Sequence, residues 1–562
     1  MRPDLRWQRR APQIVTYVLV ALVLIFLYLI FMAGQFHGLT DENAMDYAQV
    51  AQNLAQGEGF TTNFIKPISL TRNTSLARHP DLTYPPLHPW LTSLVMRARG
   101  TNDQAAALAS GIPFLLTVPL VFVLTGWIFD RRTAWLATVL HFTNFEILRY
   151  AISGLEVCLL SLWLLVLFMV LYQYAQRADL QPALAGAVGL LIGLIYLTKY
   201  IWVVVLIPVL IYLYYSTEDH ARIRTLLVAV AVFVIVISPW CYRTYQVSGN
   251  PFFTWRWYEV VMNTRTNPGM TLYRSLPEKL PNPVTYALVH PMEIYEKLRA
   301  GVVNLYSVPA RIAGVYATPL FIVAILVPLG TENFEKLRYL LYGVLVLIIV
   351  SLLFVAAASR LLYPVAPVLT VVAAAFFFRI LLPLVQDYVS PLRRRYTALG
   401  IAVLMLLHTT PLLFALTIRR RPGERPPIQH SQDWADQAKE LGGSPIITDQ
   451  PWLLAWHSDM TVVWLPKTSA DLKRIQQRVG QLPWMLLTPA VTRNEVTERT
   501  EEWAGLWRQA VAREVPPYYG FVVAKRIGDG TWVLLRKNPQ AAPSAPPPPE
   551  LPTTDTLQSS EQ

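Results

Sequence analysis

The sequence predicts an all-α polytopic membrane domain of about eleven transmembrane helices, followed by a C-terminal extracytoplasmic α/β domain. Three observations predict this fold class. Hydrophobic residues make up 54% of the 562 residues and charged residues only 15%, whereas a soluble protein carries about 25% charged residues. The apolar residues are concentrated in runs of about 20 residues, the length that crosses a bilayer. Beyond residue 417 these runs give way to short segments that are typical of strands.

The chain begins with a basic segment, residues 1–13, followed by an apolar run over 14–33. This layout resembles a signal peptide, but the run is too long and no clear small-residue cleavage site follows it. We therefore expect an uncleaved first span, with 1–13 as a cytoplasmic N-terminus. The membrane domain is expected over 14–417. Its predicted spans lie near 14–33, 105–127, 133–148, 153–175, 181–197, 200–215, 224–242, 312–329, 337–357, 361–382 and 397–417.

Positive residues in the short loops set the orientation of these spans. One side carries most of them, including Arg131–Arg132 and Arg393–Arg395. The short loops on the other side carry Arg149, Lys199 and Arg360. The first side is therefore predicted to be cytoplasmic, in a multi-pass protein of the cytoplasmic (inner) membrane. Because the number of spans is odd, the C-terminal domain is expected outside.

The net charge of +12 does not indicate a nucleic-acid-binding protein, because much of the excess lies in these orienting loops. Two long loops, near 34–104 and 243–311, are expected on the outer side. The first contains NAMDYAQVAQNLAQG, whose apolar residues follow helical spacing and which ends at Gly57. It predicts a short helix that lies along the membrane surface.

Residues 418–537 have a different pattern. SPIITD, MTVVWLP and PWMLLT are typical of strands, and FVVAKRI-GDG-TWVLLRK predicts a hairpin that turns on Gly528–Gly530. We predict a small extracytoplasmic α/β domain here. The last segment, 538–562, includes four consecutive prolines and predicts a disordered tail.

Several ionisable residues are expected to meet at the outer membrane edge, where such residues are costly unless they are paired, solvated or functional. They are Asp41, Glu42, Glu156, Lys199, Arg243 and Arg360, with Tyr363 close to the last of them. Acids beside cations suit transfer from a phosphate-linked donor. A carboxylate can take the proton of an acceptor hydroxyl, and Lys or Arg can hold the departing phosphate.

Structural roles also account for these residues one by one. Asp41 is a suitable N-cap for the predicted surface helix, with Glu42 favoured by the helix dipole. Glu156 can pair with Arg149 across a short loop. The three cations can extend to lipid head groups. Four outer-side histidines permit a divalent metal site, but no ligand spacing supports one; they are His37, His79, His88 and His290.

Four stretches of the chain, taken in order, resemble one known family. They are DENAMDYAQVAQNLAQGEGF with YPPLHPWL after the first span, SGLEVCLLSLWLL at the fourth, ISPWCYRTYQVSGNPF at the end of the seventh, and SRLLYPVAPVL at the tenth. Their order and spacing are similar to those of the GT-C membrane glycosyltransferases that use polyprenyl-phosphate sugars. The resemblance is to the bacterial branch similar to protein O-mannosyltransferases and the lipid A aminoarabinose transferase, and it covers about 14–540.

The resemblance implies an inverting single displacement. In it, Asp41 matches the catalytic aspartate, Glu42 completes an Asp-Glu pair, and Glu156 matches the second acid. The basic residues that hold the lipid phosphate correspond to Lys199, Arg243 and Arg360, with Tyr363 nearby. One departure is that the aminoarabinose transferases carry an acid-Lys-Pro element where this chain has Thr83–Pro86. The departure weakens the case for a metal and for aminoarabinose as the sugar.

The sequence therefore predicts a membrane glycosyltransferase. It moves a sugar from a polyprenyl-phosphate donor to a lipid, glycan or protein acceptor at the outer face of the membrane. The alternative is a transporter or flippase of lipid-linked saccharides. A transporter is expected to show repeated halves and broken helices around charges at the membrane midplane, whereas here the ionisable residues lie at one edge. A structural scaffold is a third interpretation, and it does not require those charges to converge.

Overall fold

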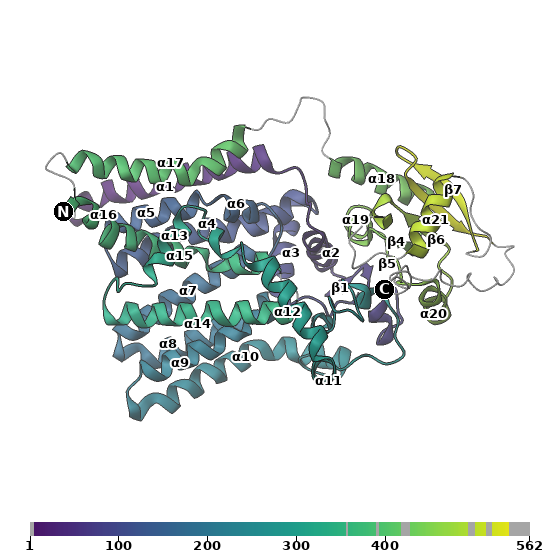
Figure 1. Ribbon diagram of the computed structural model, residues 1–562, viewed down its shortest axis with the longest axis horizontal. Coiled ribbons are helices and arrows are strands. Elements are labelled where there is room, and N and C mark those ends of the chain that lie inside the picture. The colour runs from purple at the N-terminus through teal and green to yellow at the C-terminus, as the bar shows by residue number, and fades with distance from the viewer. Residues whose placement is uncertain are drawn as a thin grey trace, which may run out of the picture. The chain divides into compact units, whose positions relative to one another are not determined.

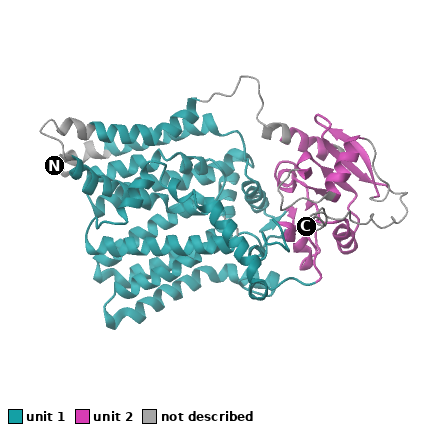
Figure 2. Ribbon diagram, in the orientation of Figure 1, with its two compact units in different colours: residues 1–62, 78–269, 279–431 teal, residues 63–77, 270–278, 432–562 magenta. Residues whose placement is uncertain are grey.

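The structure is a computed structural model, and it describes residues 5–355, 358–388, 393–417, 427–492, 501–512 and 520–538. The chain forms two compact units (Figure 2). Unit 1 comprises 1–62, 78–269 and 279–431, and unit 2 comprises 63–77, 270–278 and 432–562. The first residues of the predicted C-terminal domain, 418–426, and the predicted tail, except Asn538, lie outside the described residues.

Unit 1 is built from helices, the longest of which run side by side (Figure 1). Eight segments of the described chain are long and apolar enough to cross a membrane. The helices in these segments are α1 (Leu5–Gln35), α4 (Asp103–Ile128), α7 (Val157–Gln176), α8 (Gln181–Thr198), α10 (Arg222–Ser248), α14 (Glu332–Phe354), α15 (Ala366–Phe376) and α17 (Arg393–Thr417). The prediction of an all-α polytopic membrane domain is confirmed.

The remaining three of the eleven predicted spans are too short to be counted as crossings. The predicted span 133–148 is two helices, because the side chain of Asn144 caps the second by accepting from the Glu146 amide at 3.2 Å. The elements concerned are α5 (Arg131–Phe142), α6 (Phe145–Ala151), η3 (Tyr200–Val205), α9 (Leu206–Tyr215) and α13 (Ala317–Ala324). The predicted span 200–215 is helical throughout, but it is only as long as η3 and α9 together, 6 and 10 residues. In the predicted span 312–329 the α-helix α13 has only 8 residues.

Glycine lets α8 and α10 pack closely. A side chain at Gly189 would clash with the carbonyl oxygen of Ala229, and one at Gly193 would lie within 2.6 Å of Val236. Small residues are favoured at helix interfaces in membranes, because they bring the backbones together where water supplies no hydrophobic driving force. This contact fixes α8, whose end positions one of the predicted site residues.

The loops that flank the spans carry short elements. They are α2 (Glu42–Gln56), β1 (Thr61–Thr62), β3 (His79–Pro80), α3 (Leu87–Arg99), η5 (Trp255–Val260), α11 (Pro283–Val289) and α12 (Pro291–Leu305). The short helices η8 (Ser359–Val365) and α16 (Leu382–Tyr388) flank α15, and η8 and the start of α16 belong to the same apolar segment, Ser359–Val385. The predicted helix after the first span is present as α2, and it is covered by the rest of the protein. That it lies along the membrane surface stays a prediction. Residues 44–53 are all buried, polar ones included. The polar positions Asp46, Gln49 and Asn53 follow helical spacing, so α2 has a polar buried face as well as an apolar one.

Unit 2 contains a six-stranded sheet of order β2-β5-β4-β6-β8-β7. The first four strands are parallel, and β8 joins them antiparallel to β6 and β7. The strands are β2 (Phe64–Ile65), β4 (Ile446–Thr448), β5 (Val462–Trp464), β6 (Trp484–Leu487), β7 (Phe521–Ile527) and β8 (Trp532–Lys537). The helices are η1 (Pro67–Thr71), η6 (Thr271–Arg274), α18 (Pro427–Leu441), α19 (Pro451–His457), α20 (Ser469–Val479), η10 (Pro489–Thr492) and α21 (Glu501–Ala512).

The predicted strands and hairpin of the α/β domain are present, but the domain is not one continuous stretch. Strand β2 comes from the first predicted outer loop and pairs with β5, Phe64 opposite Val462. Segment 270–278 comes from the second, and the Arg274 side chain donates to the Leu465 carbonyl at 2.8 Å. Unit 2 thus uses two loop segments that the prediction assigned to the membrane domain.

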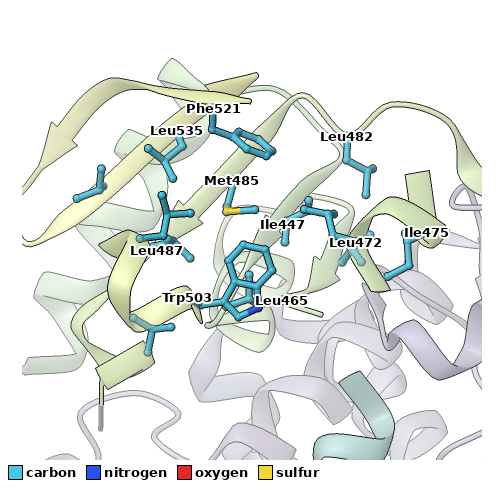
Figure 3. Packing of buried hydrophobic residues seen from close by; sticks show 14 of the residues in the cluster. Ile447, Leu465, Leu472, Ile475, Leu482, Met485, Leu487, Trp503, Phe521 and Leu535 are labelled. Atoms are coloured by element: carbon cyan, nitrogen blue, oxygen red, sulfur yellow. The ribbon is translucent and has the colours of Figure 1, made fainter. Parts of the chain in front are cut away.

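The core of unit 2 is apolar and lies around Trp503 (Figure 3). Trp503 is fully buried among Leu465, Met485 and Leu487, and its indole N–H donates to the Pro466 carbonyl at 2.7 Å. A buried indole needs such a partner. The core includes Ile65 and Leu276 from the two loop segments. Burial of these apolar side chains explains why the segments join unit 2.

Unit 2 is expected to lose stability as the pH rises from 4 to 7. Burial raises the pKa of Asp449 to about 6, although the Thr488 amide and hydroxyl donate to its carboxylate at 3.0 and 2.6 Å. A folded-state pKa above the unfolded value stabilises the fold at low pH, and this contribution, about 3 kcal/mol, is lost through pH 6. In Asp449→Asn the neutral amide can accept from the Thr488 amide and donate to the Thr488 hydroxyl, so hydrogen-exchange protection of β4 and β6 should no longer fall with pH.

Asp529 supplies the matched control. It accepts the same pair of bonds from Thr531, but it is exposed and its pKa is lowered, chiefly by the Thr531 hydroxyl and then by the Thr531 amide. Asp529→Asn should therefore leave the loss of protection between pH 4 and 7 in place. Equal pH profiles for wild type and Asp449→Asn would contradict the assignment to Asp449.

Candidate active site

Asp41 lies at the start of α2 and caps it. One carboxylate oxygen accepts from the backbone amides of Asn43 and Ala44, at 2.8 and 3.3 Å. The other oxygen, Oδ2, lies 3.7 Å from Nη1 of Arg360 on η8. The side chain is 37% exposed. The capping role is therefore real, and it leaves one oxygen turned toward a cation and open to a ligand.

Glu156 and Lys199 form a buried ion pair, with 2.6 Å between Oε1 and Nζ. Glu156 precedes α7, and Lys199 occupies the extended break between α8 and η3. Nζ of Lys199 also donates to the hydroxyl of Tyr47 at 3.3 Å. Neither carboxylate oxygen accepts a further hydrogen bond from the described residues. The alternative pairing is wrong, because Arg149 pairs with Glu146 at 3.3 Å.

Electrostatics keeps this pair charged at neutral pH. Burial raises the pKa of Glu156, but Lys199 and then Arg360 outweigh burial and hold it well below its usual value. Burial lowers the pKa of Lys199 to about 8, with Glu156 opposing the shift. A buried ammonium, with Arg360 as a further cation near its partner, is suited to binding an anionic group.

Four of the predicted residues form two acid–cation pairs, and the other three lie outside these two pairs. Asp41 meets Arg360, and Arg360 acts electrostatically on Glu156, which meets Lys199. Glu42 lies in the first turn of α2 with its side chain exposed. Tyr363 packs against Tyr150, with ring centroids 5.1 Å apart.

Arg243 has a structural setting of its own. Its guanidinium donates to the carbonyls of Phe60 and Asp81, both at 2.8 Å, and lies over the rings of Phe60 and Trp240. Arg243 therefore ties together the residues on either side of the β1–β3 pair, Phe60 before β1 and Asp81 after β3. Within the described residues, its hydrogen bonds and ring contacts involve neither Lys199 nor Arg360.

Changing Arg243 is expected to weaken the fold more than donor binding. Arg243→Gln cannot span both carbonyls, and the lost bonds should cost about 1–3 kcal/mol, seen as a lower melting temperature in detergent. The donor KM should change less than threefold. Arg149→Gln, which removes an exposed pair, should change neither quantity. A large rise in donor KM without a loss of stability would instead support the donor-phosphate role.

The sequence did not single out several residues that line the same site. The ring of Tyr47 packs on that of Tyr84 at 4.1 Å, and the guanidinium of Arg256 lies 5.0 Å from the Tyr84 centroid. Arg256 also pairs with Glu259 at 2.6 Å. Asp46 is buried and hydrogen bonds with Tyr84. The helical spacing of the polar residues on α2 could have indicated that Asp46 is buried. Arg256 lies in a loop whose sequence shows no such periodicity.

The donor set does not fit a metal. Among the described residues, no group of three or more His, Cys, Asp or Glu side chains is arranged to hold one. Asp41 and Glu156 each face a cationic side chain, which occupies the position a divalent ion would need. We therefore derive no step through a metal.

Comparison with known proteins identifies the fold. Residues 83–242 match the family model of dolichyl-phosphate-mannose-protein mannosyltransferases. This part contains Glu156 and Lys199. No curated protein sequence matches the chain.

Two solved structures are similar in fold. ArnT from Cupriavidus metallidurans, bound to undecaprenyl phosphate, is 17% identical with a TM-score of 0.55, over 95% of this chain and 99% of that one. The oligosaccharyltransferase AglB from Archaeoglobus fulgidus, in complex with an inhibitory peptide and a dolichol-phosphate, is 13% identical with a TM-score of 0.51, over 91% and 73%. The predicted GT-C fold is confirmed. The family model and the fold support a membrane glycosyltransferase and do not favour a transporter.

Proposed function

We propose that this protein transfers a sugar from a polyprenyl-phosphate-linked donor to an acceptor at the outer face of the cytoplasmic membrane. The observation that carries the proposal is the meeting of two acid–cation pairs, Asp41 with Arg360 and Glu156 with Lys199. The lipid phosphates bound by ArnT and AglB support this class of donor. The inhibitory peptide bound by AglB is compatible with a protein acceptor, and lipid and glycan acceptors stay open.

The reaction is a single displacement with inversion. Oδ2 of Asp41 takes the proton of the acceptor hydroxyl as its oxygen attacks the anomeric carbon of the sugar. The bond between that carbon and the phosphate oxygen breaks, and its electron pair leaves with the polyprenyl phosphate. The leaving group is already a good one, so no acid has to protonate it. Asp41 suits the base role because one oxygen is fixed by the helix cap while the other is accessible.

Cations stabilise the charge that collects on the phosphate. The donor diester carries about one negative charge, and the product carries up to two near neutral pH. Lys199, Arg256 and Arg360 act on one another and on Tyr47 electrostatically, so they lie around one place. Because Lys199 and Arg360 are largely buried, their charges act in a medium of low dielectric constant, where they favour the transition state more than they would in water.

Glu156 differs from Asp41 in what it can do. Its side chain is fully buried and its charge is directed at Lys199. We assign it to holding that cation and orienting the site, and we leave proton removal to Asp41. Glu42, exposed beside Asp41, is placed to orient the acceptor at the entrance.

The test is a transfer assay with the purified protein in liposomes. A panel of radiolabelled polyprenyl-phosphate sugars is supplied with lipid, glycan and peptide acceptors, and release of polyprenyl phosphate is followed with and without a chelator. We expect turnover of one donor class and no effect of the chelator. Movement of a labelled lipid-linked saccharide between leaflets, with no release of polyprenyl phosphate, would favour the flippase alternative.

A further inference from the structure

His88 is a buried residue beside the site that the proposed reaction does not use. It lies in the first turn of α3 and is fully buried. Its Nε2 is 2.9 Å from the carbonyl oxygen of Gly154. Its ring meets the ring of Tyr47 edge-on, with centroids 5.1 Å apart. His88 therefore touches both the turn that leads into Glu156 and the tyrosine that contacts Lys199.

The Gly154 turn needs this support. Gly154 has a φ of +77°, which favours glycine, and a side chain there would come within 2.8 Å of Leu39. The turn is held by bonds to its carbonyls. His88 binds the carbonyl of Gly154, and Ser110 donates to that of Leu155 at 2.8 Å. The next residue is Glu156, so a shift of the turn moves the carboxylate.

The contacts form a closed ring. Lys199 donates to the Tyr47 hydroxyl at 3.3 Å and lies 2.6 Å from Glu156. Glu156 follows the turn that begins at Gly154, and Gly154 is bound by His88, which packs on Tyr47. Every member of this ring is buried, Gly154 included. Such a ring allows Lys199 one position.

We propose that His88 is a positioning residue. It fixes the Gly154 turn and the ring of Tyr47, so that Glu156 and Tyr47 hold the Lys199 ammonium at the place where the donor phosphate binds. This inference rests on the proposed function for the identity of the anion, but the geometry of the ring does not depend on it.

The histidine acts in its neutral form. A carbonyl accepts, so Nε2 must carry a proton, and Nδ1 has no hydrogen-bond partner among the described residues. Burial lowers the pKa of His88, the Gly154 carbonyl and Glu156 oppose this, and Lys199 adds to it. A neutral imidazole adds no repulsion to Lys199, whose other charged neighbours are Glu156, Arg256 and Arg360.

The test compares His88→Ala with His88→Gln in the full chain. The side-chain amide of Gln can donate to the Gly154 carbonyl and Ala cannot. Misplacing a binding group by about 1 Å costs on the order of 100-fold, so we expect His88→Ala to lower the donor kcat/KM by that factor and His88→Gln to recover most of it. A second readout is the reactivity of Lys199 toward an amine-specific reagent, measured against pH by mass spectrometry. His88→Ala should shift this profile and His88→Gln should restore it.

His408 supplies the matched control. It is also buried, its Nε2 lies 2.8 Å from the carbonyl of Leu140, and its Nδ1 likewise has no partner among the described residues. His408→Ala should lower the melting temperature but leave kcat/KM and Lys199 labelling within threefold of wild type. Wild-type kinetics and labelling in His88→Ala would overturn the proposal. The labelling of Lys199 does not require turnover. If the protein transferred no sugar, the proposed function would be refuted, and the labelling would still test the role of His88.

Discussion

Asp41→Asn should reduce sugar transfer by on the order of 10²–10⁴-fold, the usual contribution of a positioned general base. The amide cannot accept the acceptor's proton, so the acceptor hydroxyl must attack while it is still protonated, as a weaker nucleophile. The helix should survive, because asparagine caps a helix about as well as aspartate, and the Asn43 and Ala44 amides keep an oxygen acceptor. Donor binding, measured by retention of the labelled polyprenyl-phosphate sugar, should change little.

Asp130→Asn is the matched control for the cap. Asp130 accepts from the amides of Arg132 and Thr133 at 2.8 and 3.0 Å and starts α5 in the same way that Asp41 starts α2. Asp41 also pairs with Arg360, whereas Asp130 forms no ion pair with a described residue. We expect near wild-type transfer from Asp130→Asn. If Asp41→Asn also turned over at the wild-type rate, the base would have to be sought at Glu156 or Asp46.

The sequence predicted the residues at one membrane edge but not which of them meet. Charge bias in short loops orders residues along the membrane normal, and it placed Lys199 and Arg360 on one side. It carries no information on their arrangement within the membrane plane. Arg243, at the same predicted depth, therefore could not be told apart from the other two, although it binds backbone carbonyls instead.

Local sequence patterns predicted the secondary-structure elements better than the contacts that these elements make with one another. The strand patterns of the C-terminal region are borne out by β4, β5, β6 and the β7–β8 hairpin. The pairing of β2 with β5 joins residues about 400 positions apart, and β2 has only two residues. No periodicity can be read from so short a strand. For the same reason the contact of Arg256 with Tyr84 could not be expected from its loop.

Lys199→Met should cost about 3–5 kcal/mol of stability, because it leaves the Glu156 carboxylate buried without its partner. Transfer should also be lost, since the donor phosphate loses a cation. The informative protein is the double variant Lys199→Met/Glu156→Gln. Removing both charges relieves the unpaired carboxylate, so its melting temperature should return most of the way to wild type. Its donor KM should remain raised by at least tenfold.

Comparing the melting temperature with the donor KM distinguishes an ion pair that binds the donor from one that only stabilises the fold. Arg338 and Glu335 form another ion pair in unit 1, at 2.9 Å. The Arg338 guanidinium also donates to the carbonyls of Ala324 and Val327. Arg338→Met/Glu335→Gln should therefore lose stability and keep the wild-type donor KM. Recovery of both stability and donor KM in Lys199→Met/Glu156→Gln would mean that the buried pair only holds α7 against the end of α8. Recovery of stability alone would show that Lys199 is kept buried, at the energetic cost of a paired acid, in order to bind the donor.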